Sequence, residues 1–406
     1  MQGPASPGGQ MGAGAWAVFR VFLRLGLTSF GGPIAHLGYF RDEFVARRGW
    51  LSESEYAELI ALCQFLPGPA SSQVGMAIGL SRAGIRGAVA AWCGFTLPSA
   101  VLMILFALGL TRWGAALPAD ALHGLKLVAV AVVAQAVWGM ARLFCIDSTR
   151  VLLAVAAAAM VLYWPQAWVQ VGVIVLGAVV GLSLRRVAEP AEGSGLAISL
   201  STRMGLSMLA CFLALLLLLP LAAQYFSSSN LRVFDAFYRS GALVFGGGHV
   251  VLPLLQAEVV SPGWMDINRF LSGYGAAQAM PGPLFTFAAF LGAAMSAGPG
   301  GWIGGLLGLL AIFLPSFLLV LGVLPFWSRL RRQRGVQAAL AGVNAAVVGL
   351  LLAALYDPLW TTAVRDWRDA AWVVVGVAAL MWAKLPAWLV VLALGLGGAV
   401  SVWFAG

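Results

Sequence analysis

The chain has 406 residues, of which 61% are hydrophobic and 10% are charged, whereas an ordinary soluble domain has roughly 45–50% apolar and about 25% charged residues. Its 24 basic and 15 acidic residues are too few to cover the wet surface of a soluble fold of this length. This composition predicts an all-α polytopic membrane protein. The net charge of +9 does not indicate nucleic-acid binding, because the arginines and lysines are scattered between apolar runs.

Nine apolar stretches fit or nearly fit the roughly 20 residues that a helix needs to cross a bilayer core without interruption. We expect transmembrane helices at 86–112, 119–144, 147–164, 165–184, 204–226, 300–327, 336–356, 370–384 and 386–404.

Four further apolar elements are interrupted by glycine and proline. They are 14–46, broken at Gly31-Gly32-Pro33; 53–81, broken at Pro67-Gly68-Pro69; 231–260, broken at Gly246-Gly247-Gly248; and 267–297, broken at Pro281-Gly282-Pro283. Such breaks leave backbone groups that lipid cannot satisfy, so they are tolerated only inside protein or beside a water-filled cavity. The sequence leaves open whether these elements cross the membrane or are re-entrant.

The breaks recur in the same order and reveal an internal repeat. Ser29-Phe30-Gly31-Gly32 corresponds to Val244-Phe245-Gly246-Gly247, Gln64 to Pro69 corresponds to Gln278 to Pro283, and Pro98-Ser99 corresponds to Pro315-Ser316. We therefore divide the chain into a first repeat (1–184), a linker with one transmembrane helix (185–230) and a second repeat (231–406). Each repeat holds two broken elements and about four helices, so the extra helix inverts the second repeat, an arrangement typical of transporters.

The basic residues indicate an orientation. If the broken elements are re-entrant, fifteen basic residues lie on one side of the membrane and six on the other. The positive-inside rule assigns the first side to the cytoplasm. We expect a cytoplasmic N-terminus and a C-terminus outside, in the plasma membrane (the inner membrane of a bacterial cell).

The ionisable groups expected within the membrane are basic. Arg20 and Arg24 lie on the first broken element, Lys126 lies in an apolar helix, and His36 and His249 follow the glycine breaks. All acidic residues are expected at or near loops and helix ends. Because ionisable groups in the membrane are costly, they are functional candidates, and a positive set favours an anion as cargo. The alternatives are that Arg20, Arg24 and Lys126 extend to the headgroups and that the histidines are structural.

The two Pro-Gly-Pro motifs supply a mechanism for anion binding. Pro69 and Pro283 suit the first turn of a following half-helix, whose free N–H groups and positive dipole end can hold an anion. Neighbouring side chains can add donors: the hydroxyls of Ser71, Ser72 and Thr286 and the amides of Gln64 and Gln278.

Several other activities are excluded or disfavoured. Neither lysine stands in the Gly-Lys-Ser/Thr sequence of a P-loop, so no ATPase site of that kind is present. Three histidines without HExxH spacing and four isolated cysteines predict no metal site, and no cofactor is expected. The run Ser52-Glu53-Ser54-Glu55 is interpreted as a helix capping box. We expect a protein that is not an enzyme.

These motifs resemble those of the chromate ion transporters in their two-domain form. The resemblance rests on the run from Phe30 to His36, on Gln64 to Pro69, and on the second-half segments 245–249 and 278–283. It implies efflux of chromate from the bacterial cytoplasm, chromate resistance, and energy from the proton motive force. The second repeat departs from the first with Gly248 in place of Pro33 and Asn344 near the place of Lys126, so we expect the first repeat to carry more of the anion binding.

The residues leave several alternatives open. Chromate and sulfate are both tetrahedral dianions, so the cargo could be sulfate or another oxyanion. A membrane enzyme acting on lipid phosphates would need a nucleophile or general base, and the broken elements offer only histidine and hydroxyls. A passive anion channel is a third possibility. The oligomeric state is open, a homodimer included.

Overall fold

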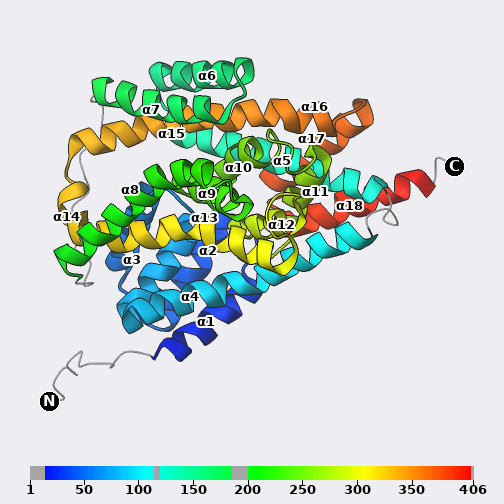
Figure 1. Cartoon of the computed structure of the whole chain (residues 1–406). Coiled ribbons are helices and arrows are strands. Elements are labelled where there is room, and N and C mark those ends of the chain that lie inside the picture. The colour runs from blue at the N-terminus through cyan, green and yellow to red at the C-terminus, as the bar shows by residue number, and fades with distance from the viewer. Residues whose placement is uncertain (1–13, 114–118, 185–199, 404–406) are drawn as a thin grey trace.

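The computed structural model describes residues 14–113, 119–184 and 200–403, and every element in these ranges is a helix (Figure 1). In the first repeat the elements are α1 (Ala15–Thr28), α2 (Gly32–Arg41), η1 (Asp42–Arg47), α3 (Glu53–Phe65), α4 (Ala70–Trp113), α5 (Ala119–Phe144), α6 (Ser148–Tyr163) and α7 (Ala167–Leu184). The connecting helix is α8 (Thr202–Tyr225); part of the predicted linker, 185–199, lies outside the described residues.

The second repeat follows the same order. Its elements are α9 (Ser229–Ala242), η3 (Gly248–Val250), α10 (Val251–Val259), α11 (Ile267–Ala277), η4 (Leu284–Thr286), α12 (Phe287–Ala294), α13 (Gly301–Val323), η5 (Leu324–Phe326), α14 (Trp327–Leu330), α15 (Arg334–Ala354), η6 (Leu355–Trp360), α16 (Thr361–Ala363), α17 (Trp367–Met381) and α18 (Ala387–Trp403).

The expected fold class is confirmed: the chain is an all-α polytopic membrane protein, and a helix covers each of the nine predicted stretches. Among the described residues, five helical segments are long and apolar enough to cross a membrane: 70–113, 122–144, 202–225, 301–330 and 334–363. Helices α6 and α7 are apolar but shorter. Ala83 and Gly84 have non-helical backbone angles and separate the two predicted parts of α4.

Each broken element folds back on itself. Trp50 directly precedes the broken element 53–81, and Arg82 directly follows it. The Arg82 guanidinium lies 5.1 Å from the centre of the Trp50 ring. In the matching element of the second repeat, Ser296 N–H donates to the Trp264 carbonyl at 2.9 Å. Because start and end lie together, these elements are hairpins, which is the geometry that the re-entrant alternative requires.

The other two broken elements are hairpins as well. The Phe22 ring on α1 stacks on Phe44 in η1 with centroids 5.0 Å apart. Arg239 on α9 forms an ion pair with Glu258 on α10 at 2.9 Å.

The hairpin tips of one repeat meet those of the other. Gly68 N–H donates to the Val244 carbonyl at 2.7 Å, and Gly282 N–H donates to the Ser29 carbonyl at 2.9 Å. Each contact is the counterpart of the other under the repeat, and such reciprocity is the signature of a two-fold relation between two similar units. The breaks predicted from the sequence therefore form one central layer where the repeats interlock.

The local sequence explains how the tips form. Gly68 and Gly282 have φ values of +121° and +90°, a region that side chains rarely adopt. A Cβ on Gly68 would lie 2.5 Å from Ser316 Oγ, and one on Gly282 would lie 2.9 Å from Ser99 Oγ. The recurring Pro-Ser pairs are thus the surfaces against which the opposite tips pack. The capping box at Ser52, which starts α3, is confirmed.

The described ends of the chain lie on opposite sides of the molecule. In Figure 1 the start of α1 is at the lower left and the end of α18 is at the right. Helix α14 lies at the left and α16 at the right, as alternating crossings require.

The expectation that every acidic residue lies near a loop or helix end is wrong. Glu58 lies in the middle of α3 and Asp235 in the middle of α9, and both are buried, as is Glu43 in the first turn of η1. Each is paired with arginine: Glu58 with Arg331 at 2.7 Å, and Asp235 with Arg239 at 2.9 Å; Glu43 pairs with two neighbouring arginines. Pairing offsets the cost of burying a carboxylate, which a charge count along the sequence cannot reveal.

Candidate functional site

The polar residues of the first repeat gather where its hairpin tips meet. His36 Nδ1 on α2 lies 3.3 Å from Ser71 Oγ on the first turn of α4, and the His36 ring packs edge-on against Phe95, 5.2 Å away. The same ring lies near the backbone of Ser29. Gln73 Nε2 donates to the Pro67 carbonyl at 2.7 Å and ties the Pro-Gly-Pro loop to the start of α4.

We call five of these side chains the tip cluster. It comprises His36, Ser71 and Ser29, which His36 contacts, and Ser72 and Gln73, which follow Ser71 in the first turn of α4. All five are at most 2% exposed, so the cluster is closed to solvent in this structure.

Most of the tip cluster has polar atoms without a partner. Four of its five members have a buried atom that makes no hydrogen bond: Ser29 Oγ, His36 Nε2, Ser72 Oγ and Gln73 Oε1. Such an atom costs about 1–3 kcal/mol when buried unpaired, and a native structure rarely keeps one unless a ligand or water satisfies it. Hydroxyl and imidazole N–H groups are donors that can serve an oxyanion.

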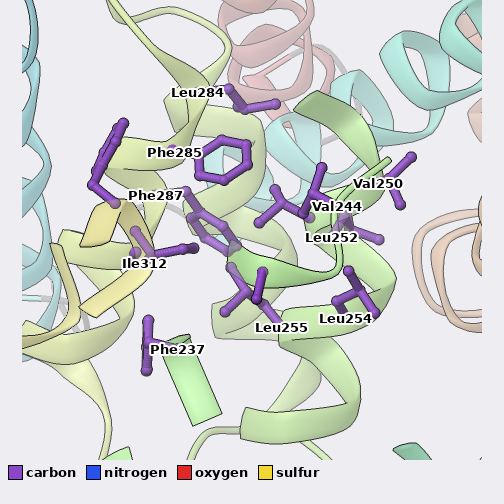
Figure 2. Packing of buried hydrophobic residues seen from close by; sticks show 14 of the residues in the cluster. Phe237, Val244, Val250, Leu252, Leu254, Leu255, Leu284, Phe285, Phe287 and Ile312 are labelled. Carbon is purple, nitrogen blue, oxygen red and sulfur yellow. The ribbon is translucent and has the colours of Figure 1, made fainter. Parts of the chain in front are cut away.

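The second repeat does not reproduce the tip cluster. By the repeat offset, Val244 stands for Ser29, Phe285 for Ser71 and Phe287 for Gln73. These side chains pack in an apolar core with Leu252, Leu255 and Ile312 (Figure 2). Thr286, the counterpart of Ser72, is satisfied by donating to the Pro283 carbonyl at 2.9 Å.

A smaller set of polar residues lies near the two breaks of the second repeat. His249 Nδ1 lies 2.9 Å from the Tyr274 hydroxyl, and the Gln278 side chain lies beside the same hydroxyl. Asn344 Oδ1 would lie 3.5 Å from a Cβ on Gly246. His36 and His249 therefore follow equivalent breaks but have different partners.

The structure brings several predicted site residues to the tips. Gly68 and Gly282 make the crossing hydrogen bonds, Pro69 directly precedes α4, and Pro283 directly precedes η4. The two prolines thus stand one residue before their helices, not inside the first turn. Pro67, Pro281, Gly246 and Gly247 belong to the same loops, while Gly31 and Gly32 start α2 at a partly exposed edge of its tip.

Four predicted residues lie elsewhere. Arg20, Arg24 and Gln64 are exposed on the outer faces of their helices. Lys126 is buried, but its Nζ donates to Asn268 Oδ1 at 3.0 Å. Asn268 is in the first turn of α11, at the end of that helix farther from the loop 278–283.

Ser29, Gln73 and Thr96 are buried polar residues that the prediction of site residues omitted. The repeat contains a usable signal for them. Each is polar in the first repeat and apolar in the second, where Val244, Phe287 and Phe313 stand. A buried position that is polar in one repeat and apolar in the other marks where the two halves differ.

Two interlocked helical repeats with broken helices at their centre define the fold of a membrane transporter. The profile of the chromate transporter family matches residues 16–182 and 231–399 of this chain. The chain belongs to the chromate transporter family.

Curated proteins match nearly the whole chain. The chromate transport protein of Pseudomonas aeruginosa is 30% identical over 396 residues, which cover 94% of this chain and 91% of that protein. A probable chromate transport protein of Synechococcus elongatus is 25% identical over 409 residues, with 93% of each chain covered. An uncharacterized transporter of Methanocaldococcus jannaschii is 26% identical over 384 residues, with 93% and 92% covered. No solved structure matches the chain.

Proposed function

We propose that this protein exports chromate across the bacterial inner membrane and thereby confers chromate resistance. The observation that carries the proposal is the tip cluster: four buried polar atoms without partners, among donors suited to an oxyanion, at the centre of a transporter fold. The names of the Pseudomonas and Synechococcus relatives support chromate as the cargo.

The tips hold the anion in this proposal. His36 and Ser71 donate from one side, and the N–H groups at the start of α4 face the anion with the positive end of the helix dipole. Ser72 adds a hydroxyl from the same turn. Lys126, buried near the opposite end of α11, acts on the path to the site and does not contact the bound anion.

Transport proceeds by alternating access. The tips of the two repeats are joined by Gly68–Val244 and Gly282–Ser29 hydrogen bonds, so rocking one repeat against the other moves the walls of the tip cluster. The buried cluster described here corresponds to the occluded state, closed to both sides.

The membrane potential can drive export. Moving one charge through the potential is worth about 2.3 kcal/mol per 100 mV, so a dianion leaving a negative interior gains twice that amount. A cytoplasmic N-terminus and an external C-terminus fit the hairpin finding, because re-entrant hairpins are the condition under which the basic residues divide fifteen to six.

Chromate uptake by everted membrane vesicles, with the potential clamped, tests the function. We expect saturable uptake by the wild type, and at least a tenfold lower rate for His36→Ala and His36→Gln at equal insertion. Arg20→Ala, an exposed basic residue outside the tip cluster, is the matched control and should transport normally. Wild-type uptake by His36→Ala would refute the site.

Competition by unlabelled sulfate, phosphate and molybdate in the same vesicles separates the cargoes. Chromate as the native cargo predicts that sulfate competes more weakly than unlabelled chromate. Stronger competition by sulfate would assign the site to a sulfate transporter.

A further inference from the structure

Two polar atoms outside the tip cluster lie buried where the repeats meet. They are Trp92 Nε1 and Thr96 Oγ1, both on the second part of α4, and neither has a hydrogen-bond partner among the described residues. Trp92 is 8% exposed and Thr96 is 0% exposed. A buried indole N–H usually has a partner, and an unpaired buried group costs about 1–3 kcal/mol. Two such groups on one helix therefore point to a polar ligand or water at this place.

Both side chains face helix α13 of the second repeat. The Trp92 ring packs edge-on against Phe313 and Phe317, with centroids 5.6 and 5.7 Å away. Thr96 follows Trp92 by four residues, so the two side chains share one face of α4. The indole N–H and the hydroxyl thus lie along the contact between α4 and α13, to which each repeat contributes one helix.

The tip cluster borders the same contact. Gln73 Nε2 donates to Ser316 Oγ on α13 at 3.4 Å, and Ser316 stands between the two phenylalanines that the indole ring touches. On α4, the His36 ring packs against Phe95, which directly precedes Thr96. The two unpaired atoms therefore adjoin the unpaired atoms of the tip cluster.

The course of α4 gives these two residues an order. Its break at residues 83–84 lies on the side that the charge distribution assigns to the cytoplasm, because Arg82 and Arg86 flank the break. Trp92 lies six residues beyond Arg86, about 9 Å along the helix, and Thr96 about 6 Å farther. An anion that moves inward along this face of α4 passes Trp92 first and Thr96 second.

The second repeat has apolar side chains at the equivalent positions. By the repeat offset, Leu309 stands for Trp92 and Phe313 for Thr96, and both are at most 1% exposed. Because the second repeat is inverted, these two side chains occupy the outer half of the contact between α4 and α13. The unpaired donors are thus confined to the half that faces the cytoplasm.

We propose that Trp92 and Thr96 line the entry path of the oxyanion from the cytoplasm to the tip cluster and donate hydrogen bonds to it on the way. Rocking one repeat against the other separates α4 from α13 and opens this path. The N–H and O–H groups then offset part of the cost of removing water from the charged oxyanion. The inference rests on the proposed transport function.

Side-specific cysteine labelling tests the entry path. Trp92→Cys and Thr96→Cys are placed singly in the full-length chain with its four native cysteines replaced by serine. A membrane-impermeant thiosulfonate that carries a sulfonate is the probe. We expect at least tenfold faster labelling in everted vesicles, which expose the cytoplasmic face, than in right-side-out vesicles. Excess chromate should slow labelling in everted vesicles at least threefold, because the anion occupies the same path.

Ser240→Cys in the same background is the matched control. Ser240 is also buried, but it lies on α9 and its hydroxyl donates to the Ala236 carbonyl, so this variant should react slowly from both sides. Labelling of Trp92→Cys and Thr96→Cys at the control rate would overturn the inference. Equal rates from the two sides, or faster labelling from the outside, would overturn it as well.

Two conservative changes in the chain with its native cysteines give an independent measurement. Trp92→Phe keeps an aromatic ring against α13 and Thr96→Val keeps the side-chain shape, but each removes the donor. Chromate uptake by everted vesicles should fall at least fivefold. Equilibrium chromate binding by the purified protein should stay within twofold of wild type, because the bound anion lies in the tip cluster.

Wild-type uptake in both conservative variants would contradict the entry path. A loss of uptake that only follows a lower thermal midpoint would also contradict it, because that result indicates a structural role. If the wild type itself takes up no chromate, the proposed function fails instead. The difference in labelling between the two sides needs no chromate and still decides the path in that case.

Discussion

Ser72 offers a test in which stability and transport should change in opposite directions. Ser72 is 2% exposed, and its hydroxyl has no hydrogen-bond partner. A buried unsatisfied polar group costs about 1–3 kcal/mol. Ser72→Ala removes the group and leaves no large cavity, so we expect the oxyanion-free protein to become more stable by about 1 kcal/mol, a rise in unfolding midpoint on the order of 2 °C.

The same substitution should weaken transport. A hydrogen bond to a charged group contributes about 1.5–3 kcal/mol, which corresponds to roughly a ten- to 150-fold change in binding. We therefore expect the apparent KM for chromate in everted vesicles to rise by at least about tenfold. Thermal unfolding of the purified protein without oxyanion supplies the stability measurement.

Ser240→Ala is the matched control. Ser240 is equally buried, but its hydroxyl donates to the Ala236 carbonyl at 2.8 Å. This variant should leave the KM unchanged and should not raise the unfolding midpoint. If Ser72→Ala lowered stability, or left the KM within twofold of wild type, the assignment of the tip cluster as an oxyanion site would be wrong.

Three further changes test other parts of the structure. Gly68→Ala should reduce the yield of folded protein or reduce transport at least tenfold, because its φ is +121° and the new Cβ would lie 2.5 Å from Ser316 Oγ; a fluorescence-detected gel filtration profile and vesicle uptake check this. Glu58→Gln removes one member of the buried Glu58–Arg331 ion pair and should cost about 3–5 kcal/mol of stability; a thermal midpoint equal to wild type would contradict it. Lys126→Ala should lower the rate of chromate uptake while leaving the affinity in equilibrium binding unchanged, since Lys126 lies away from the tip cluster; loss of binding would place Lys126 at the anion itself.

Much of the architecture follows from the sequence. Lipid demands continuous apolar helices, so the nine long stretches are visible as hydropathy. Glycine and proline interrupt helices through covalent geometry, so the four breaks at residues 31–33, 67–69, 246–248 and 281–283 are equally visible. Their constant spacing exposes the repeat.

The candidate site could be predicted only in part. His36, Ser71 and Ser72 follow breaks, and the structure buries all three at the hairpin tips; that they bind an anion stays a prediction. Arg20 and Arg24 were predicted on another ground, as basic groups within an apolar element, and they lie exposed on α1, because the direction of a side chain depends on which helix face the partner covers.

The scarcity of charged residues indicated the class of the protein, and the apolar stretches indicated its helices. Only the tertiary structure decided which charged residues are buried and which of them form ion pairs. Glu58 and Arg331 stand far apart in sequence, one in each repeat, and the fold brings them together as an ion pair at 2.7 Å. The physical reason is that composition and local geometry act along the chain, whereas burial and pairing depend on contacts between distant segments. In the same way the sequence placed the breaks, and the fold made Gly68 meet Val244 and Gly282 meet Ser29.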